Sequence, residues 1–331
     1  MTQMKQAVPT FQQSTRLKYV NVTTLTKPVG GGITQIDIPK SGLLHRLYLR
    51  ISVTTAGALS VLNPYGISAA IRRVRLTLNS GIDLINISGP GYHWLLRDMV
   101  DNFLDVSAQS TARNAILTAT TYNLDMVLPV SLNAKDAIGL VMLQNEETLA
   151  TLVIDWESDA NLATGMTLTG TCTPMMAVFE VPQDPRSYPD LSVLQQIIED
   201  SVAVPAGADY TYNWQRGATY LGTYHLMQAN GFTRAVLRAQ QSMILADLDA
   251  GRMVALQNSI NERDLTLSGG AITGSDKRIF WDFSGTDGLG MFGVGRDVID
   301  SSRLTDLATV ITPAGVATLT TVRRQLIRVR G

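Results

Sequence analysis

The feature that most constrains the fold is a strict alternation of residue types in the segment 46–53. One set of alternate positions carries Leu47, Leu49, Ile51 and Val53, and the other carries Arg46, Tyr48, Arg50 and Ser52. A period of two is typical of a strand that buries one face. Three glycines at 30–32 precede this segment, but no helical pattern follows them, so the stretch does not fit a phosphate-binding loop.

Similar short apolar segments, bounded by Gly, Pro or Asn, recur along the first half of the chain. They lie at residues 17–25, 32–38, 122–130, 137–143, 148–156 and 166–181. Residues 71–88 have the pattern of a hairpin that turns at 79–81. Short strands separated by turn signals predict a sandwich or a barrel.

Three segments have helical patterns. Residues 91–105 carry an apolar stripe at helical spacing, and residues 191–200 carry another, which Asp190 can cap. A short helix is also expected near residues 302–310. Residues 241–263 are ambiguous, because Gly251 interrupts an otherwise plausible helix.

The second half of the chain repeats the layout of the first. Gly32 and Gly42 are matched by Gly207 and Gly217, in both cases 175 residues further along. At the same offset Leu49 corresponds to Tyr224, so the inward-facing positions agree. Later strands are expected at 233–240, 278–284 and 315–329. We therefore expect an all-β protein of two tandem eight-stranded jelly-roll sandwiches with a few short helices.

A segment with three prolines in ten residues, 181–190, resists both helix and sheet and marks the domain boundary. The predicted division has four parts: a basic N-terminal arm at 1–18, a first jelly roll at 19–182, a proline-rich linker and helix at 183–200, and a second jelly roll at 201–331.

Composition indicates an extensively covered surface. The 331 residues are 45% hydrophobic and only 17% charged, against a usual charged fraction of about a quarter. Either the core is large or neighbouring subunits cover the outside. Cys172 is the single cysteine, which excludes a disulfide framework. The first 16 residues do not resemble a secretory signal and no apolar stretch reaches the length of a membrane span, so synthesis in a reducing cytosol is expected.

Positive charge gathers at both ends of the chain. Before the first acidic residue, Asp37, stand Lys5, Arg16, Lys18 and Lys27. After the last acidic residue, Asp306, stand Arg323, Arg324, Arg328 and Arg330. Two interpretations stay open: a chance distribution of few residues, or two termini that approach an anionic surface.

Motifs for catalysis, cofactors or metals are weak. Residues 288–293, GLGMFG, formally match a dinucleotide-binding motif, but no helical stripe follows them. The histidines, His45, His93 and His225, lack the short spacing of metal-ligand pairs. Cys172 lies among apolar residues, as a buried thiol does. Core or interface positions are the ordinary setting for the tryptophans Trp94, Trp156, Trp214 and Trp281. We expect no enzyme activity, cofactor, metal or sequence-specific nucleic-acid binding.

Residues 29–53, 66–95 and 128–156 resemble the first jelly roll of a double jelly-roll major capsid protein, and residues 281–312 are similar in layout to part of the second. This family builds the shells of tailless icosahedral bacteriophages, most of them with an internal membrane, and extends to adenovirus. The resemblance covers nearly the whole chain from about Tyr19 and rests on the order of elements.

The resemblance implies a structural role. It implies homotrimers forming pseudo-hexameric blocks of an icosahedral shell, with neighbouring capsomers, penton and minor capsid proteins as partners. The protein would be made in the host cytoplasm and located in the virion. Termini in this family tend to face inward, toward lipid headgroups of an inner membrane or toward the genome. The candidate inner-surface contacts are then Lys5, Arg16, Lys18, Arg323, Arg324, Arg328 and Arg330.

Two other function classes stay open at the level of sequence. One is a β-sandwich binding module, such as a spike or carbohydrate-binding protein, which would use exposed tryptophans. The other is an enzyme on a β scaffold, such as a glycosidase with paired carboxylates.

Overall fold

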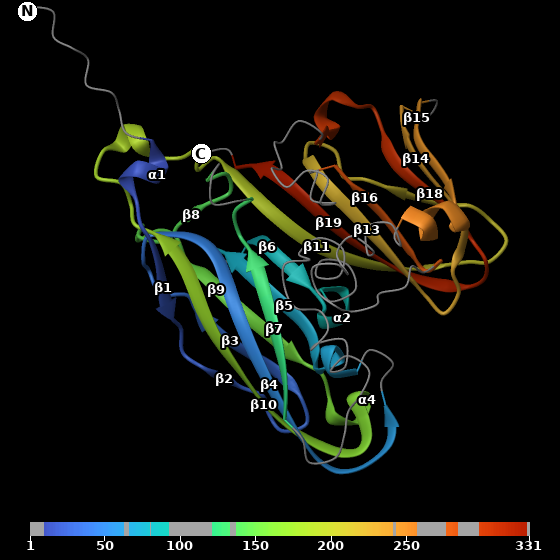
Figure 1. Cartoon of the computed structure of the whole chain (residues 1–331), viewed down its shortest axis with the longest axis horizontal. Coiled ribbons are helices and arrows are strands. Elements are labelled where there is room, and N and C mark those ends of the chain that lie inside the picture. The colour runs from blue at the N-terminus through green and yellow to red at the C-terminus, as the bar shows by residue number, and fades with distance from the viewer. Residues whose placement is uncertain are drawn as a thin grey trace, which may run out of the picture.

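The computed structural model describes residues 10–62, 66–79, 81–92, 121–132, 137–240, 243–256, 276–283 and 298–329. Strands dominate these residues and form two sandwiches side by side (Figure 1). The short helices are α1 (Phe11–Ser14), α2 (Gly89–Gly91) and α4 (Asp159–Leu162), and residues 250–256 are also helical. Single 3-10 turns lie at Gly66–Ala70, Pro185–Ser187 and Ser301–Arg303.

The first sandwich contains β1 (Leu17–Asn21), β2 (Leu25–Thr26), β3 (Gly32–Asp37), β4 (Leu43–Leu62), β5 (Ile71–Leu78), β6 (Ile82–Ile87), β7 (Thr121–Pro129), β8 (Val141–Met142), β9 (Ala150–Trp156) and β10 (Ala163–Phe179). One sheet has the order β1-β10-β4-β7, and the facing strands have the order β3-β9-β5-β6. The chain therefore crosses repeatedly between two facing sheets, which is the winding of a jelly roll.

The second sandwich contains β11 (Val193–Val204), β12 (Tyr210–Asn213), β13 (Thr219–Gln228), β14 (Phe232–Ala239), β15 (Met243–Asp249), β16 (Arg278–Asp282), β17 (Ile299–Asp300), β18 (Leu307–Pro313) and β19 (Ala317–Arg328). Its strand orders, β11-β19-β13-β16 and β12-β18-β14-β15, match those of the first sandwich strand for strand. The prediction of two tandem jelly rolls is confirmed. The predicted residue limits of the four parts stay a prediction.

The two sandwiches share a sheet. Strand β11 of the second pairs in parallel with β6 of the first, with Ile197 opposite Ile85 and Ile198 opposite Asn86. This contact fuses the two four-stranded halves into one continuous sheet, β16-β13-β19-β11-β6-β5-β9-β3. We call the β6–β11 contact the seam. Main-chain pairing across it makes the double sandwich one block.

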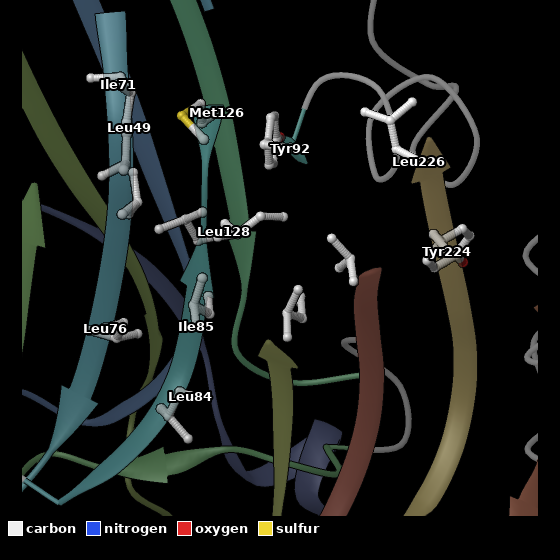
Figure 2. Packing of buried hydrophobic residues seen from close by; sticks show 14 of the residues in the cluster. Leu49, Ile71, Leu76, Leu84, Ile85, Tyr92, Met126, Leu128, Tyr224 and Leu226 are labelled. Carbon is white, nitrogen blue, oxygen red and sulfur yellow. The ribbon is translucent and has the colours of Figure 1, made fainter. Parts of the chain in front are cut away.

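The core follows the alternation in β4. Leu47, Leu49, Ile51 and Val53 are at most 1% exposed, as the period of two predicts. They belong to one buried cluster that continues through both sandwiches. Figure 2 shows side chains such as Ile85 and Leu128 of the first sandwich in the same cluster as Tyr224 and Leu226 of the second.

The helix predicted at 191–200 is wrong, because this segment forms β11. Asp190 does not cap a helix but accepts hydrogen bonds from the backbone N–H (2.9 Å) and hydroxyl (2.6 Å) of Ser192. The helix near 302–310 is limited to a 3-10 turn that ends at Arg303, and β18 begins at Leu307. In both places ladder pairing with β19 or β14 outweighs a local helical pattern.

Other predictions fall partly outside the described residues. Only Gly91 and Tyr92 of the helix predicted at 91–105 are described, and GLGMFG at 288–293 lies wholly outside. The ambiguous stretch 241–263 contains β15 and the helical residues 250–256, and its remainder lies outside. Of the strand predicted at 137–143, only Val141 and Met142 are paired.

Candidate functional site

The seam is held by polar side chains as well as by main-chain pairing. The Glu199 carboxylate, on β11, accepts hydrogen bonds from the backbone N–H (2.8 Å) and the hydroxyl (2.9 Å) of Ser88. Ser88 caps α2 by accepting a hydrogen bond from the backbone N–H of Gly91 (2.9 Å). Arg73 of β5 approaches the other carboxylate oxygen of Glu199 at 3.6 Å. A buried carboxylate of the second sandwich thus orders a helix start of the first.

Burial raises the pKa of Glu199, while hydrogen bonds from Ser88 and the charge of Arg73 oppose that rise. The net direction is upward, so the environment disfavours the charged form overall. Among the described residues, the hydrogen-bond donors to this carboxylate are the hydroxyl and backbone amide of Ser88, Arg73 lies nearby, and the charge of Asp200 adds to the upward shift of its pKa. The arrangement suits a structural role, in which Glu199 of the second sandwich holds Ser88 and Arg73 of the first.

Two glutamines of β11 add direct ties to the first sandwich. The side-chain amide of Gln196 donates to the carbonyl oxygen of Asp83 in β6 (2.7 Å), and that of Gln195 donates to the carbonyl oxygen of Pro129 in β7 (2.9 Å). Gln325 of β19 donates in turn to the side-chain oxygen of Gln196 (3.0 Å). These contacts fix the register of the seam.

The described parts of the two termini lie at the same end of the molecule (Figure 1). Phe11 of α1 packs edge-on against Phe179, with ring centroids 5.3 Å apart, and joins a small cluster that includes Leu191. Next to Leu191, the carbonyl oxygen of Ser192 accepts a hydrogen bond from the backbone N–H of Val329 (2.8 Å). We call this end, built from residues 10–18, 179–192 and 328–329, the terminal face.

Three of the predicted basic contacts are exposed at the terminal face: Arg16, Lys18 and Arg328. Lys18 pairs with Glu180, and the hydrogen bond from Lys18 is the main cause that lowers the pKa of that carboxyl group. Hydrogen bonds from Ser192 and Ser302 are the main causes that lower the pKa values of Asp190 and Asp300, and the charge of Arg328 adds to both. Positive charge at this face is therefore partly balanced within the chain.

The other predicted basic contacts are placed differently. Arg323 is 12% exposed, pairs with Asp200 at 2.8 Å and donates to the side-chain oxygen of Gln215 (3.2 Å). Arg324 is 6% exposed, and its Nε has no hydrogen-bond partner among the described residues. Lys5 and Arg330 lie outside the described residues.

Sequence reasoning missed two exposed apolar strands at the free edges of the double sandwich. Strand β1 exposes Leu17 (39%) and Tyr19 (59%). Strand β15 exposes Met243 (50%), Ile244 (60%) and Leu245 (40%). Both are terminal strands of their sheets among the described strands. The run of apolar residues at 243–245 was readable in the sequence, but its exposure was not.

The histidines and the cysteine that were weighed as metal ligands or nucleophiles are, where described, buried side chains. His225 is fully buried between the hydroxyls of Thr321 (2.8 Å) and Thr309 (3.2 Å), and burial lowers its pKa to about 3. Burial, with the charge of Arg46, lowers the pKa of His45 to about 4. Burial raises the pKa of the Cys172 thiol to about 12, as expected for a thiol that is no nucleophile. His93 lies outside the described residues.

Three tryptophans, Trp156, Trp214 and Trp281, are at most 6% exposed, which removes them from any sugar-binding face. Trp94 lies outside the described residues. Within the described ranges, His, Cys, Asp and Glu side chains form no group of three that could hold a metal ion. No helix in those ranges combines the length and the apolar character needed to cross a membrane.

Comparison with known proteins shows the fold. No family model matches the sequence, and no curated protein matches it. The crystal structure of the STIV MCP is similar with a TM-score of 0.70 and 12% identity, covering 95% of this chain and 97% of the other. The PBCV-1 virus capsid is similar with a TM-score of 0.65 and 9% identity, covering 98% of this chain and 97% of the other. The major capsid protein P2 from bacteriophage PM2 is similar with a TM-score of 0.54 and 14% identity, covering 95% of this chain and 98% of the other. The chain therefore has the double jelly-roll fold of viral major capsid proteins.

Proposed function

We propose that this protein is the major capsid protein of an icosahedral virus, a structural subunit of the virion shell. One observation carries the proposal: both jelly rolls and their connection align with capsid chains over nearly the full length of each. Similarity confined to one sandwich would fit many unrelated binding modules. Two sandwiches joined through a shared sheet instead form one rigid unit, which suits a structural subunit of a shell better than an enzyme.

We infer that the subunit forms a homotrimer, in which six similar sandwiches give a pseudo-hexameric outline. Closed symmetry is the usual outcome for a soluble oligomer. An obligate interface of this kind buries on the order of 2,000 Å² or more. In the shell the trimers meet neighbouring capsomers, penton proteins and minor capsid proteins.

Quantification of each protein in a purified virion tests the shell role. A shell subunit is the most abundant protein of the particle, whereas a spike or an enzyme is present in far fewer copies. Light scattering of the purified protein at micromolar concentration tests the oligomer. A persistent monomer that never assembles counts against the proposal.

The terminal face supports a second part of the proposal, a contact with lipid headgroups beneath the shell. Arg16, Lys18 and Arg328 are exposed together there, and α1 holds the N-terminal segment against this end. Each cationic side chain near an anionic bilayer contributes about 1 kcal/mol, weakened by salt. A trimer multiplies this contribution threefold without any inserted helix.

Flotation with anionic vesicles tests the lipid contact. Trimers should float at low salt and not at high salt, and a variant with Arg16, Lys18 and Arg328 all changed to Gln should float less. The matched control is Arg50→Gln, because Arg50 is exposed on β4 away from the terminal face. Equal flotation of the triple variant and the control would assign the basic residues to contacts between subunits.

A further inference from the structure

Three side chains of the second sandwich form a row across neighbouring strands. Thr223 of β13 lies opposite Trp281 of β16 on one side and opposite Arg323 of β19 on the other. His225, two residues further along β13, is hydrogen-bonded to Thr309 of the facing sheet (3.2 Å). Because alternate residues of a strand share a face, Thr223 also points into the sandwich, and its two neighbours in register do the same. We call Trp281, Thr223 and Arg323 the polar row.

Each member of the polar row has a buried polar atom that lacks a protein partner. The Thr223 hydroxyl oxygen, the Trp281 Nε1 and the Arg323 Nε form no hydrogen bond to any described residue. Thr223 is 0% exposed and Trp281 6%. Nearly all buried polar groups in folded proteins are bonded to protein or to ordered water, since an unpartnered one costs free energy. Three such groups side by side therefore indicate a bound hydrogen-bonding ligand.

The next polar groups on the same inner face are satisfied within the protein. His225 lies between the hydroxyls of Thr321 (2.8 Å) and Thr309 (3.2 Å). The Trp214 indole donates to the hydroxyl of Thr309 (3.0 Å). Buried polar side chains of this sandwich thus find partners where protein groups are close enough. The polar row differs from its surroundings in that its partner must come from elsewhere.

The first sandwich shows that the fold does not require polar residues at such a place. Strands β7, β4 and β10 have the same order in its sheet as β16, β13 and β19 have in theirs. There Met126, Leu49 and Pro174 lie side by side, and all three are buried. Apolar side chains of this kind need no hydrogen-bond partner, and packing alone fills the row. The polar row is therefore a property of the second sandwich and not of the jelly roll in general.

The chemistry of the row selects a neutral ligand. The Trp281 indole and the Arg323 Nε each offer an N–H donor, and the Thr223 hydroxyl can donate or accept. The charge of Arg323 is already balanced, because its guanidinium lies 2.8 Å from the carboxylate of Asp200. An anion would bring an uncompensated charge into a buried place, which is costly. A small neutral molecule that both accepts and donates hydrogen bonds fits these groups.

The spacing of the row suits a water molecule. Adjacent strands lie about 4.8 Å apart. A water that is hydrogen-bonded to two groups at about 2.9 Å each can bridge up to about 5.8 Å between them. Buried waters make about three hydrogen bonds to groups that would otherwise be unsatisfied, and the polar row supplies three such groups.

We propose that the polar row binds an ordered internal water, which accepts hydrogen bonds from the Trp281 indole and the Arg323 Nε and donates one to the Thr223 hydroxyl. The water is a structural ligand of the second sandwich. It joins β16, the terminal described strand of its sheet, to β13 and β19 through side chains as well as through the main chain. The proposal rests on the interior of one sandwich, so it holds or fails independently of the shell role and of the oligomer.

The direction of a stability change tests whether the Thr223 hydroxyl has a partner. Thr223→Val keeps the shape of the side chain and removes the hydroxyl. Loss of a bonded hydroxyl destabilises a protein, whereas loss of an unpartnered buried one stabilises it. We expect a lower urea midpoint for Thr223→Val, in the same direction as for the matched control Thr321→Val, whose hydroxyl is bonded to His225. A midpoint that is raised or unchanged overturns the proposal.

A crystal structure of the unsubstituted full chain, at a resolution that shows ordered waters, locates the ligand directly and decides even if Thr223→Val does not fold. We expect a density peak within about 3.5 Å of all three polar atoms of the row. The absence of that peak overturns the proposal whatever the urea midpoints show. Crystals soaked in sodium bromide separate water from an anion. An anomalous peak at the row would overturn the assignment to water.

Discussion

Gly42 lies so close to Phe179 that a side chain cannot be added without moving the backbone. A Cβ atom at Gly42 would meet the carbonyl oxygen of Phe179 at 2.3 Å, and the φ angle of Gly42 is +59°. This turn leads into β4 beside the end of β10, where the ladder between these two strands ends with Leu43 opposite Phe179. The position requires glycine for two independent reasons, steric and conformational.

Gly42→Ala should lower the free energy of unfolding by about 2–5 kcal/mol, from the left-handed backbone and the overpacked contact together. The matched control is Gly217→Ala, the counterpart in the second sandwich. It has φ +82° and nothing within 4 Å of an added Cβ, so only the backbone cost of about 1–2 kcal/mol applies. Urea titration followed by circular dichroism measures both. Equal losses would contradict the role of the Phe179 contact.

Glu199 should be tested by two substitutions. Glu199→Ala leaves the donors of Ser88 without their acceptor at the seam and should cost about 1–3 kcal/mol. Glu199→Gln keeps an acceptor oxygen and should cost less. The comparison is made by thermal unfolding at pH 7, and a larger loss for the Gln variant than for the Ala variant would refute the assigned contacts.

The raised pKa of Glu199 also sets a pH dependence. A carboxyl group whose pKa is higher in the folded state adds stability below its unfolded value of 4.5, and this stability is lost as pH rises through the folded value. Gln cannot ionise, so the stability of Glu199→Gln relative to wild type should improve between pH 4 and pH 7. A difference that stays constant over this range would show that Glu199 does not titrate as described.

His225 and His45 should make the protein sensitive to acid. Burial lowers the pKa of His225 from 6.5 to about 3, and burial with the charge of Arg46 lowers that of His45 from 6.5 to about 4. The unfolded chain therefore binds protons in this pH range that the folded chain does not bind. Stability is therefore full above pH 6.5 and falls as pH drops toward pH 4, by up to about 1.4 kcal/mol per pH unit for each histidine. His225→Gln should reduce this slope, measured by urea titrations at a series of pH values. An unchanged slope would exclude His225 as its source.

Two ion pairs should differ sharply in their contribution. Lys27 Nζ lies 2.5 Å from Asp159 Oδ1, and the Lys27 side chain is 1% exposed. Asp159→Ala leaves that ammonium group buried without its partner and should cost about 3–5 kcal/mol. Glu180→Ala removes the partner of the well-exposed Lys18 and should change stability little, because solvent and salt screen that pair. Similar losses for the two variants, measured by urea titration, would contradict this distinction.

Much of the fold could be predicted because strand periodicity is a local property. The alternation in β4, the hairpin of β5 and β6, and the turn glycines at 42 and 217 are all visible in the chain and present in the structure. The failure at β11 has a physical reason. Leu194, Ile197 and Ile198 lie on one helical face, but in the structure Leu194 and Ile197 are buried by β19 and β6 from other parts of the chain.

The candidate interfaces could be predicted only in part. Clusters of basic residues at the ends of the chain were readable, but the tertiary structure distinguishes exposed Arg16 from buried Arg324. The hydrogen bonds between Ser88 and Glu199 join residues 111 positions apart, which no local pattern could indicate.

The sequence by itself determined the class of the fold, because alternating strands, turn residues and a repeated layout are set by neighbours along the chain. Only the tertiary structure decided that β6 and β11 pair while β1 and β15 stay exposed. Equivalent strands with similar local patterns have different surroundings, and burial depends on which strand lies alongside. The exposure of the apolar edges is therefore a property of the folded double sandwich and not of any one segment of the chain.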